Sequence, residues 1–353
     1  MIEGKAFAAI RRGRRSRQST GTLGRLGGAA IPTPVIYTQN GKRPHLKLIL
    51  AFARGRLFAV KTAFAAVFRR CLAACLLATL ASGCSTINVA YSAGPTVLSF
   101  IADGYLDLDG DQESALKQRI LALREWDRST NLAGYAALLG EVRARAAGRI
   151  SPEDVAWTVA EARKRSIPMA ERVAGEVADL APLLTAENLA AMKKKMESKT
   201  ADYVKEVVRA SPEKQRARRL ETIVKETERW FGDLEDQQLD RIRVMVDALP
   251  ANYALALENR QRRAAEFLAI LSAAVDKGAD KIQTRRRLLR LLTDWESIRT
   301  PAYQAFAAQY QAASYKLTAE IVNMTTQAQR ETAQKRAQRW VTDMSALAAR
   351  PAP

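Results

Sequence analysis

The sequence predicts an all-α protein, an elongated multi-helix bundle of amphipathic helices with no β-sheet. Three observations support this prediction. Apolar residues recur every three or four positions along much of the chain, which is the period of an amphipathic helix. Proline, serine, threonine and aspartate stand where helices begin. No alternating run of β-branched residues is long enough to indicate a strand.

Helix starts recur after residue 150. Ser151-Pro152-Glu153-Asp154 combines an N-cap residue, a proline at the first helical position and an acidic first turn. Ser211-Pro212-Glu213 repeats the pattern. Because proline removes a backbone donor, Pro168 is expected to kink or interrupt the helix that begins at Pro152. Further starts are predicted at Thr185, Asp233, Pro250 and Pro301.

The apolar positions after these starts fall on single helix faces. The last stripe runs from Tyr303 to Met324 and predicts a long final helix. Its continuation, Thr325–Arg339, is almost wholly polar, so we expect that end to project from the body or to fray. Nearer the front, Pro95–Ala102 is predicted to be a short apolar helix following a tether.

A targeting segment ends just before Cys84. Arg69 and Arg70 form a charged region, the mostly apolar run Cys71–Leu80 follows, and Ala81, Ser82 and Gly83 supply the small residues of a signal-peptidase site. The apolar run is too short to span a bilayer, which needs about 20 residues. Ser-Gly-Cys resembles a lipobox, so Cys84 is expected to carry a covalent diacylglycerol and an acyl chain such as palmitate. The alternatives are an ordinary cleaved signal or a short uncleaved anchor.

These targeting signals imply a protein that is anchored in a bacterial envelope. Ser85 after the cysteine resembles the sorting signal for the outer membrane, so we expect attachment to its periplasmic face, with the periplasmic face of the inner membrane as the alternative. The membrane is then a partner through the lipid anchor.

The basic excess of the chain lies mostly in front of Cys84. Residues 1–83 hold 15 of the 56 lysines and arginines but one of the 37 acidic residues. The remaining 41 basic and 36 acidic residues leave a net charge near +5 in place of +19. A strongly basic protein often binds nucleic acid, but here the excess belongs to a segment that we expect to be absent from the mature protein. We therefore predict no nucleic-acid partner.

Residues for common catalytic and metal sites are absent after Cys84. His45, Cys71 and Cys75 all precede it, which excludes histidine acid–base chemistry, a cysteine nucleophile and Cys/His zinc sites from the mature protein. Asp107, Asp109 and Asp111 alternate as in a calcium loop, but Gln112 and Gln118 stand where an EF-hand needs glycine and glutamate. We predict that these aspartates mark a helix start, and that the protein has no catalytic residues, no metal and no cofactor apart from the acyl lipid.

Basic runs in the second half are candidates for an anionic contact. Lysine and arginine runs on helices are most often solvated faces, with the aliphatic stems packed along the helix. The alternative is a surface for lipopolysaccharide phosphates, anionic lipid or an acidic partner. The candidate residues are Arg262, Arg263, Arg285, Arg286 and Arg287.

These features divide the chain into five segments. Residues 1–59 are turn-rich, and we expect them to be untranslated or disordered, because a complete signal peptide at 60–83 follows them. Residues 84–105 are predicted to be the lipid-anchored tether. An N-terminal helical half at 106–210 and a C-terminal helical half at 211–353, which contains the long final helix, complete the chain.

Several motifs resemble an uncharacterised family of Gram-negative helical lipoproteins, catalogued as a domain of unknown function. They are Tyr105–Gln112, Arg124–Trp126, Ile150–Val155, Leu184–Leu189 and Arg229–Leu234. In addition, Leu184-Thr185-Ala186-Glu187-Asn188 and Leu234-Glu235-Asp236-Gln237 are similar to the LTxxQ helix starts of Spy/CpxP-type periplasmic chaperones. The alternative for both is a plain helix N-cap. The family resemblance implies a helical fold and an envelope address but no known activity.

The expected function follows from the predicted location in the envelope and the predicted helical fold. We expect a lipid-anchored periplasmic protein that is not an enzyme and that acts as a chaperone-like or scaffolding protein for a protein client or another envelope component. The alternative is a protein that binds or hydrolyses an envelope polymer, either peptidoglycan or lipopolysaccharide.

Overall fold

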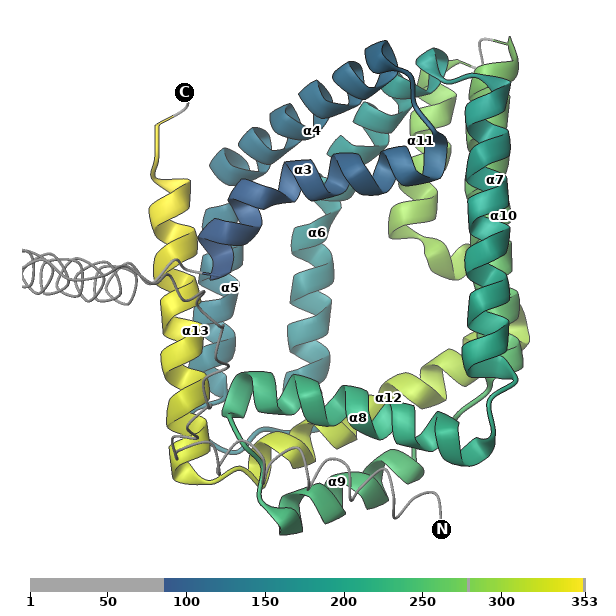
Figure 1. The fold of residues 1–353 in the computed structure, drawn as a ribbon. Coiled ribbons are helices and arrows are strands. Elements are labelled where there is room, and N and C mark those ends of the chain that lie inside the picture. The colour runs from purple at the N-terminus through teal and green to yellow at the C-terminus, as the bar shows by residue number, and fades with distance from the viewer. Residues whose placement is uncertain (1–85, 278–279, 352–353) are drawn as a thin grey trace, which may run out of the picture. The chain divides into compact units, whose positions relative to one another are not determined.

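The computed structural model describes residues 86–277 and 280–351 (Figure 1). They form eleven α-helices, short 3₁₀ segments and one π-helical turn, with no strand among these residues. The all-α prediction is therefore confirmed for this part of the chain. The helices are α3 (Thr86–Leu106), α4 (Gly110–Thr130), α5 (Leu132–Arg145), α6 (Pro152–Leu180), α7 (Ala186–Tyr203), α8 (Pro212–Phe231), α9 (Asp236–Asp247), α10 (Tyr253–Lys277), α11 (Lys281–Thr293), α12 (Pro301–Asn323) and α13 (Gln327–Ala348).

Four of the six predicted helix starts are confirmed at their caps, whereas α9 begins at Asp236 and α10 at Tyr253, three residues after the predicted Asp233 and Pro250. The Ser151 hydroxyl accepts a hydrogen bond from the Asp154 backbone amide, and Pro152 stands at the start of α6. The hydroxyls of Ser211, Thr185 and Thr300 cap α8, α7 and α12 in the same way. Such caps satisfy backbone amides that have no partner inside the helix.

The segment expected to be a tether, 84–105, is helical over its described part. α3 begins at Thr86 and contains Pro95. The helix is longer than the predicted Pro95–Ala102 because contacts with residues far along the chain hold it, whereas the lipid anchor that precedes it stays a prediction. Leu106 is buried in a cluster with Leu184, Met192 and Leu271, and α3 packs against α4 and α7. Likewise, Pro168 does not interrupt α6, which is helical from Pro152 to Leu180.

The chain after Met324 does not project. It turns at Met324 and Thr325, and Thr326 then caps a new helix, α13. Although most of its surface is polar, α13 buries Met344 and Leu347 against Leu132 and Ala136 of α5. The expected long final helix is therefore two helices, and Figure 1 shows the second one lying along α5.

The helices from 86 to 351 belong to one compact unit. α11 and α12 pack against α6, and α13 packs against α5 and α8, so helices on both sides of Ser211 contact one another. The buried side chains form separate small clusters: one joins α3, α7 and α10, another joins α6, α10 and α11, and a third joins α5 and α13. A core of this kind leaves much helix surface available for contacts.

Candidate functional site

The proposed lipidation site lies just outside the described residues. Cys84 and the cleavage residues Ala81, Ser82 and Gly83 precede Thr86, where α3 begins. The helix therefore starts two residues after the cysteine that we expect to be acylated. Within the described residues, no helix is long and apolar enough to cross a membrane.

α3 carries an exposed apolar stripe. Residues 85–102 contain no charged side chain. Val89, Val97, Phe100 and Ile101 are at least half exposed and recur at the spacing of one helix face, and Phe100 reaches 77% exposure. We call these four residues the α3 stripe. Large apolar side chains grouped on a surface indicate a contact with another molecule or a membrane.

Tyr91, on another side of α3, belongs to a polar cluster around the buried Asp127. The Tyr91 hydroxyl donates a hydrogen bond to the Asp127 carboxylate, which also accepts bonds from the Asn131 amide (3.1 Å) and the Tyr135 hydroxyl (3.3 Å). Burial, with the nearby Asp127 charge, raises the pKa of Tyr135 to about 12 and raises that of Tyr91 further. The cluster ties α3 to α4 and α5, which holds the α3 stripe outward.

The five candidate arginines do not form one surface. Arg262 pairs with Glu258 within α10 at 3.3 Å, and Arg287 of α11 pairs with Glu266 of α10 at 3.0 Å. Arg285 lies along α6, with its Nε 3.9 Å from the position a Cβ would take at Gly175. Arg263 and Arg286 are exposed. All five arginines belong to α10 or α11. Even within the run on α11, Arg285 contacts α6 whereas Arg287 contacts α10.

The aspartates of the calcium-like loop act at a helix start. Asp109 is the N-cap of α4, and its carboxylate accepts a hydrogen bond from the Gln112 amide at 2.9 Å. Asp107 has a positive φ of 52° in the turn before it. Among the described residues, no group of three or more His, Cys, Asp or Glu side chains is placed to hold a metal ion.

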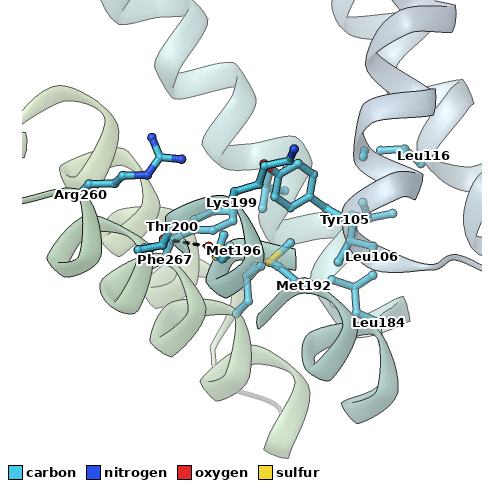
Figure 2. Close-up of a pocket in the computed structure, with 15 residues that line it drawn as sticks. Tyr105, Leu106, Leu116, Leu184, Met192, Met196, Lys199, Thr200, Arg260 and Phe267 are labelled. Atoms are coloured by element: carbon cyan, nitrogen blue, oxygen red, sulfur yellow. Dashed lines mark hydrogen bonds between the residues drawn. The ribbon is translucent and has the colours of Figure 1, made fainter. Parts of the chain in front are cut away.

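A pocket of about 460 Å³ lies between α3, α4, α6, α7 and α10 (Figure 2). Its size falls within the range of about 300–1,000 Å³ that is typical of small-molecule sites. The lining is mostly apolar. Representative residues are Tyr105 and Leu106 of α3, Met192 and Met196 of α7, and Phe267 and Leu271 of α10.

Two cationic side chains also line this pocket. Figure 2 shows Arg260 at one end of the lining, Leu116 and Leu184 toward the other, and Lys199 between them. The Arg260 guanidinium lies 5.5 Å from the centre of the Tyr203 ring and has no carboxylate partner among the described residues. Lys199 is half exposed and lies 3.7 Å from Asp202.

Sequence reasoning missed this pocket. Its walls come from residues 102–116, 177–200 and 260–271, which only the fold brings together. One local signal was present: Met192, Met196 and Lys199 recur on one face of α7, so a lysine follows two flexible apolar side chains there.

The structure therefore defines an all-helical unit. Its first described helix, α3, exposes apolar side chains, and its apolar pocket includes Arg260 and Lys199 in the lining. The chain belongs to the family of unknown function DUF6279, whose model matches residues 104–304. This finding confirms the resemblance to an uncharacterised domain. No curated protein and no solved structure matches the chain.

Proposed function

We propose that this protein is a bacterial envelope lipoprotein, anchored by acyl lipid on Cys84, that presents helical surfaces to a protein client or envelope component without catalysing a reaction. The observation that carries the proposal is the position of the α3 stripe. α3 begins two residues after Cys84, a span of about 7 Å at most, and exposes apolar side chains on a helix that carries no charge as far as Ala102.

The anchor and the α3 stripe reinforce each other. Acyl chains hold Cys84 at the bilayer surface, and a helix that starts so close to it must also lie near that surface. Apolar faces of such helices bury in the boundary between headgroups and acyl chains. Val97, Phe100 and Ile101 have that character and stand about three to four turns from the start of α3.

A groove between α9 and α12 supports the client-binding part of the proposal. Val244 of α9 is 71% exposed, and with Met245, Leu249 and Leu317 it lines a hollow of about 750 Å³. Asp240 and Glu320, together with Arg241 and Lys316, supply both signs of charge to the same lining. Apolar floors with polar rims are typical of grooves that receive amphipathic peptide segments.

The anchor is tested by intact mass spectrometry of the protein extracted from membranes, as the native chain and as Cys84→Ala. We expect the mass of the chain from Cys84 plus acyl lipid in the native protein and no lipid in the variant. Cys75→Ala is the matched control and should be lipidated normally. An unlipidated native chain that retains residues 1–59 would overturn the proposal.

The client role is tested separately. The purified protein should suppress aggregation of a chemically unfolded client without any cofactor, and Val244→Glu should weaken this suppression. Asp247→Glu, on the same helix and outside the groove, is the control. Co-sedimentation with purified sacculi, without suppression of aggregation, would instead favour the envelope-polymer alternative.

A further inference from the structure

We propose that the pocket between α3, α4, α6, α7 and α10 binds a single acyl chain that carries an anionic head, such as a fatty acid or a lysophospholipid. The chain would lie among Leu106, Met192, Met196 and Phe267, and the head would meet Arg260 and Lys199. Neither the family nor the anchor on Cys84 assigns this site.

The apolar part of the pocket suits a flexible hydrocarbon chain. It is lined by side chains from α3, α7 and α10, and among them Met192 and Met196 can adjust to the shape of a ligand because their side chains are unbranched and polarizable. Burying an acyl chain there would remove apolar surface of both ligand and protein from water, which is the main source of affinity for such ligands.

The two cationic side chains of the lining specify the sign of the head group. Arg260 has no carboxylate partner within the described residues, so its guanidinium is available for a carboxylate or phosphate. Lys199 faces Asp202 at 3.7 Å with both side chains about half exposed, and an ion pair of that kind contributes little. Cations in the lining of an apolar pocket complement an amphipathic anion and disfavour a cationic one.

α3 also offers a route for loading the ligand. Ala102, Tyr105 and Leu106 line the pocket, whereas Phe100 and Ile101, the two residues directly before Ala102, belong to the α3 stripe. If one side of α3 contacts the bilayer and the adjacent side lines the pocket, an acyl chain can pass along α3 from the bilayer into the pocket. This route rests on the proposed function, whereas binding in the pocket does not.

The test is equilibrium binding of radiolabelled laurate to the full chain carrying Cys84→Ala, which removes the covalent acyl chains as competitors. We expect saturable binding at one site. Lys199→Glu and Arg260→Glu should each weaken it about tenfold, because a charge-assisted contact is lost. Lys194→Glu, an exposed lysine of the same helix that does not line the pocket, should leave binding unchanged.

Further arms separate the head, the chain and the source of the ligand. Dodecanol, which lacks the charge, should bind at least tenfold more weakly than laurate, and Met196→Trp should abolish binding by filling the pocket while circular dichroism still reports a folded protein. Competition between laurate and lauroyl-lysophosphatidylglycerol identifies a carboxylate or a phosphate as the preferred head. Equal affinity for dodecanol, or binding that survives Met196→Trp, would overturn the proposal. A failed lipidation of Cys84 would leave this result intact.

Discussion

The side-chain amides of Gln238 and Gln329 donate hydrogen bonds to each other in both directions, at 2.8 and 2.9 Å. Both residues are buried, and each is the third residue of its helix in a capping box, at the starts of α9 and α13. Each amide also reaches across to a backbone carbonyl that precedes the other helix: Gln238 donates to Met324 and Gln329 donates to Asp233. Two helix starts far apart in sequence are thereby fastened together.

The same device occurs a second time. Gln112 at the start of α4 donates to the Asn188 side chain at 2.9 Å and to the Leu183 carbonyl. Asn188, at the start of α7, donates to the carbonyls of Leu106 and Asp107. The two segments that resemble LTxxQ helix starts therefore occupy similar places, since Asn188 of the first and Gln238, directly after Gln237 of the second, each pair with a buried side-chain amide of a distant cap.

The first prediction concerns the pair in the second half. Gln238→Ala should lower the free energy of unfolding by about 1–3 kcal/mol, because the buried donors and acceptors of Gln329 lose a partner. Urea denaturation measures the loss. Replacing both glutamines by alanine should cost less than the sum of the single changes, because the single variants each leave a buried amide unpaired. Gln327→Ala, exposed in the same first turn of α13, is the control. Additive effects would show that the two amides are not coupled.

How far the sequence predicts this fold depends on the range of the interactions involved. The caps at Ser151, Thr185 and Ser211 are local, so their residue types indicated helix starts correctly. At the turn after Met324, Thr326 is the local N-cap of α13 and accepts a hydrogen bond from the Gln329 backbone amide. The direction of α13 was missed because the pairing that orients it involves Gln238, 91 positions from Gln329.

The candidate sites follow the same rule. The lipidation motif proposed at Cys84 is a contiguous string of residues, so it could be proposed without knowledge of the fold; it lies outside the described residues and stays a prediction. The sequence did not distinguish Arg260 as a site residue because other arginines follow it closely. Only the packing of α10 against α7 places Arg260 beside Tyr203. The interruption expected at Pro168 did not occur for a related reason: packing keeps α6 helical through Pro168, as it keeps α3 helical through Pro95.

The second prediction concerns Arg128, a buried cation that holds the C-terminal end of α13. Its guanidinium donates to the carbonyls of Leu347 at 2.7 Å and Arg350 at 2.6 Å, and it pairs with Glu125, which raises the pKa of Arg128. Arg128→Met should cost about 1.5–3 kcal/mol, because charge-assisted hydrogen bonds to buried carbonyls are lost. Hydrogen exchange should show faster opening at the end of α13. Lys117→Met, exposed on the same helix, should change neither quantity.

The third prediction is a loss of stability at alkaline pH. Burial raises the pKa of Tyr135 to about 12, above its ordinary value of about 10. Above pH 10 the unfolded state releases this proton while the folded state retains it, so stability is full below about pH 10 and falls as pH rises toward 12. Tyr135→Phe should flatten this fall, as measured by urea denaturation at stepped pH. Tyr310→Phe, at an exposed tyrosine of α12, should not. An unchanged alkaline slope in Tyr135→Phe would contradict the raised pKa.

The fourth prediction tests whether the α3 stripe contacts a bilayer. The chain carrying Cys84→Ala has no acylated cysteine, so we expect the α3 stripe to mediate its binding to vesicles of phosphatidylethanolamine and phosphatidylglycerol. Phe100→Glu should weaken it about tenfold or more, because a charged side chain replaces one that is 77% exposed and apolar. The melting temperature should barely change, since Phe100 buries little of its surface in the fold. Ser92→Glu adds the same charge to an exposed position of α3 outside the stripe and should retain most of the binding. If both variants bound equally well, α3 would lie away from the membrane, and its apolar residues would instead be a surface for a protein partner.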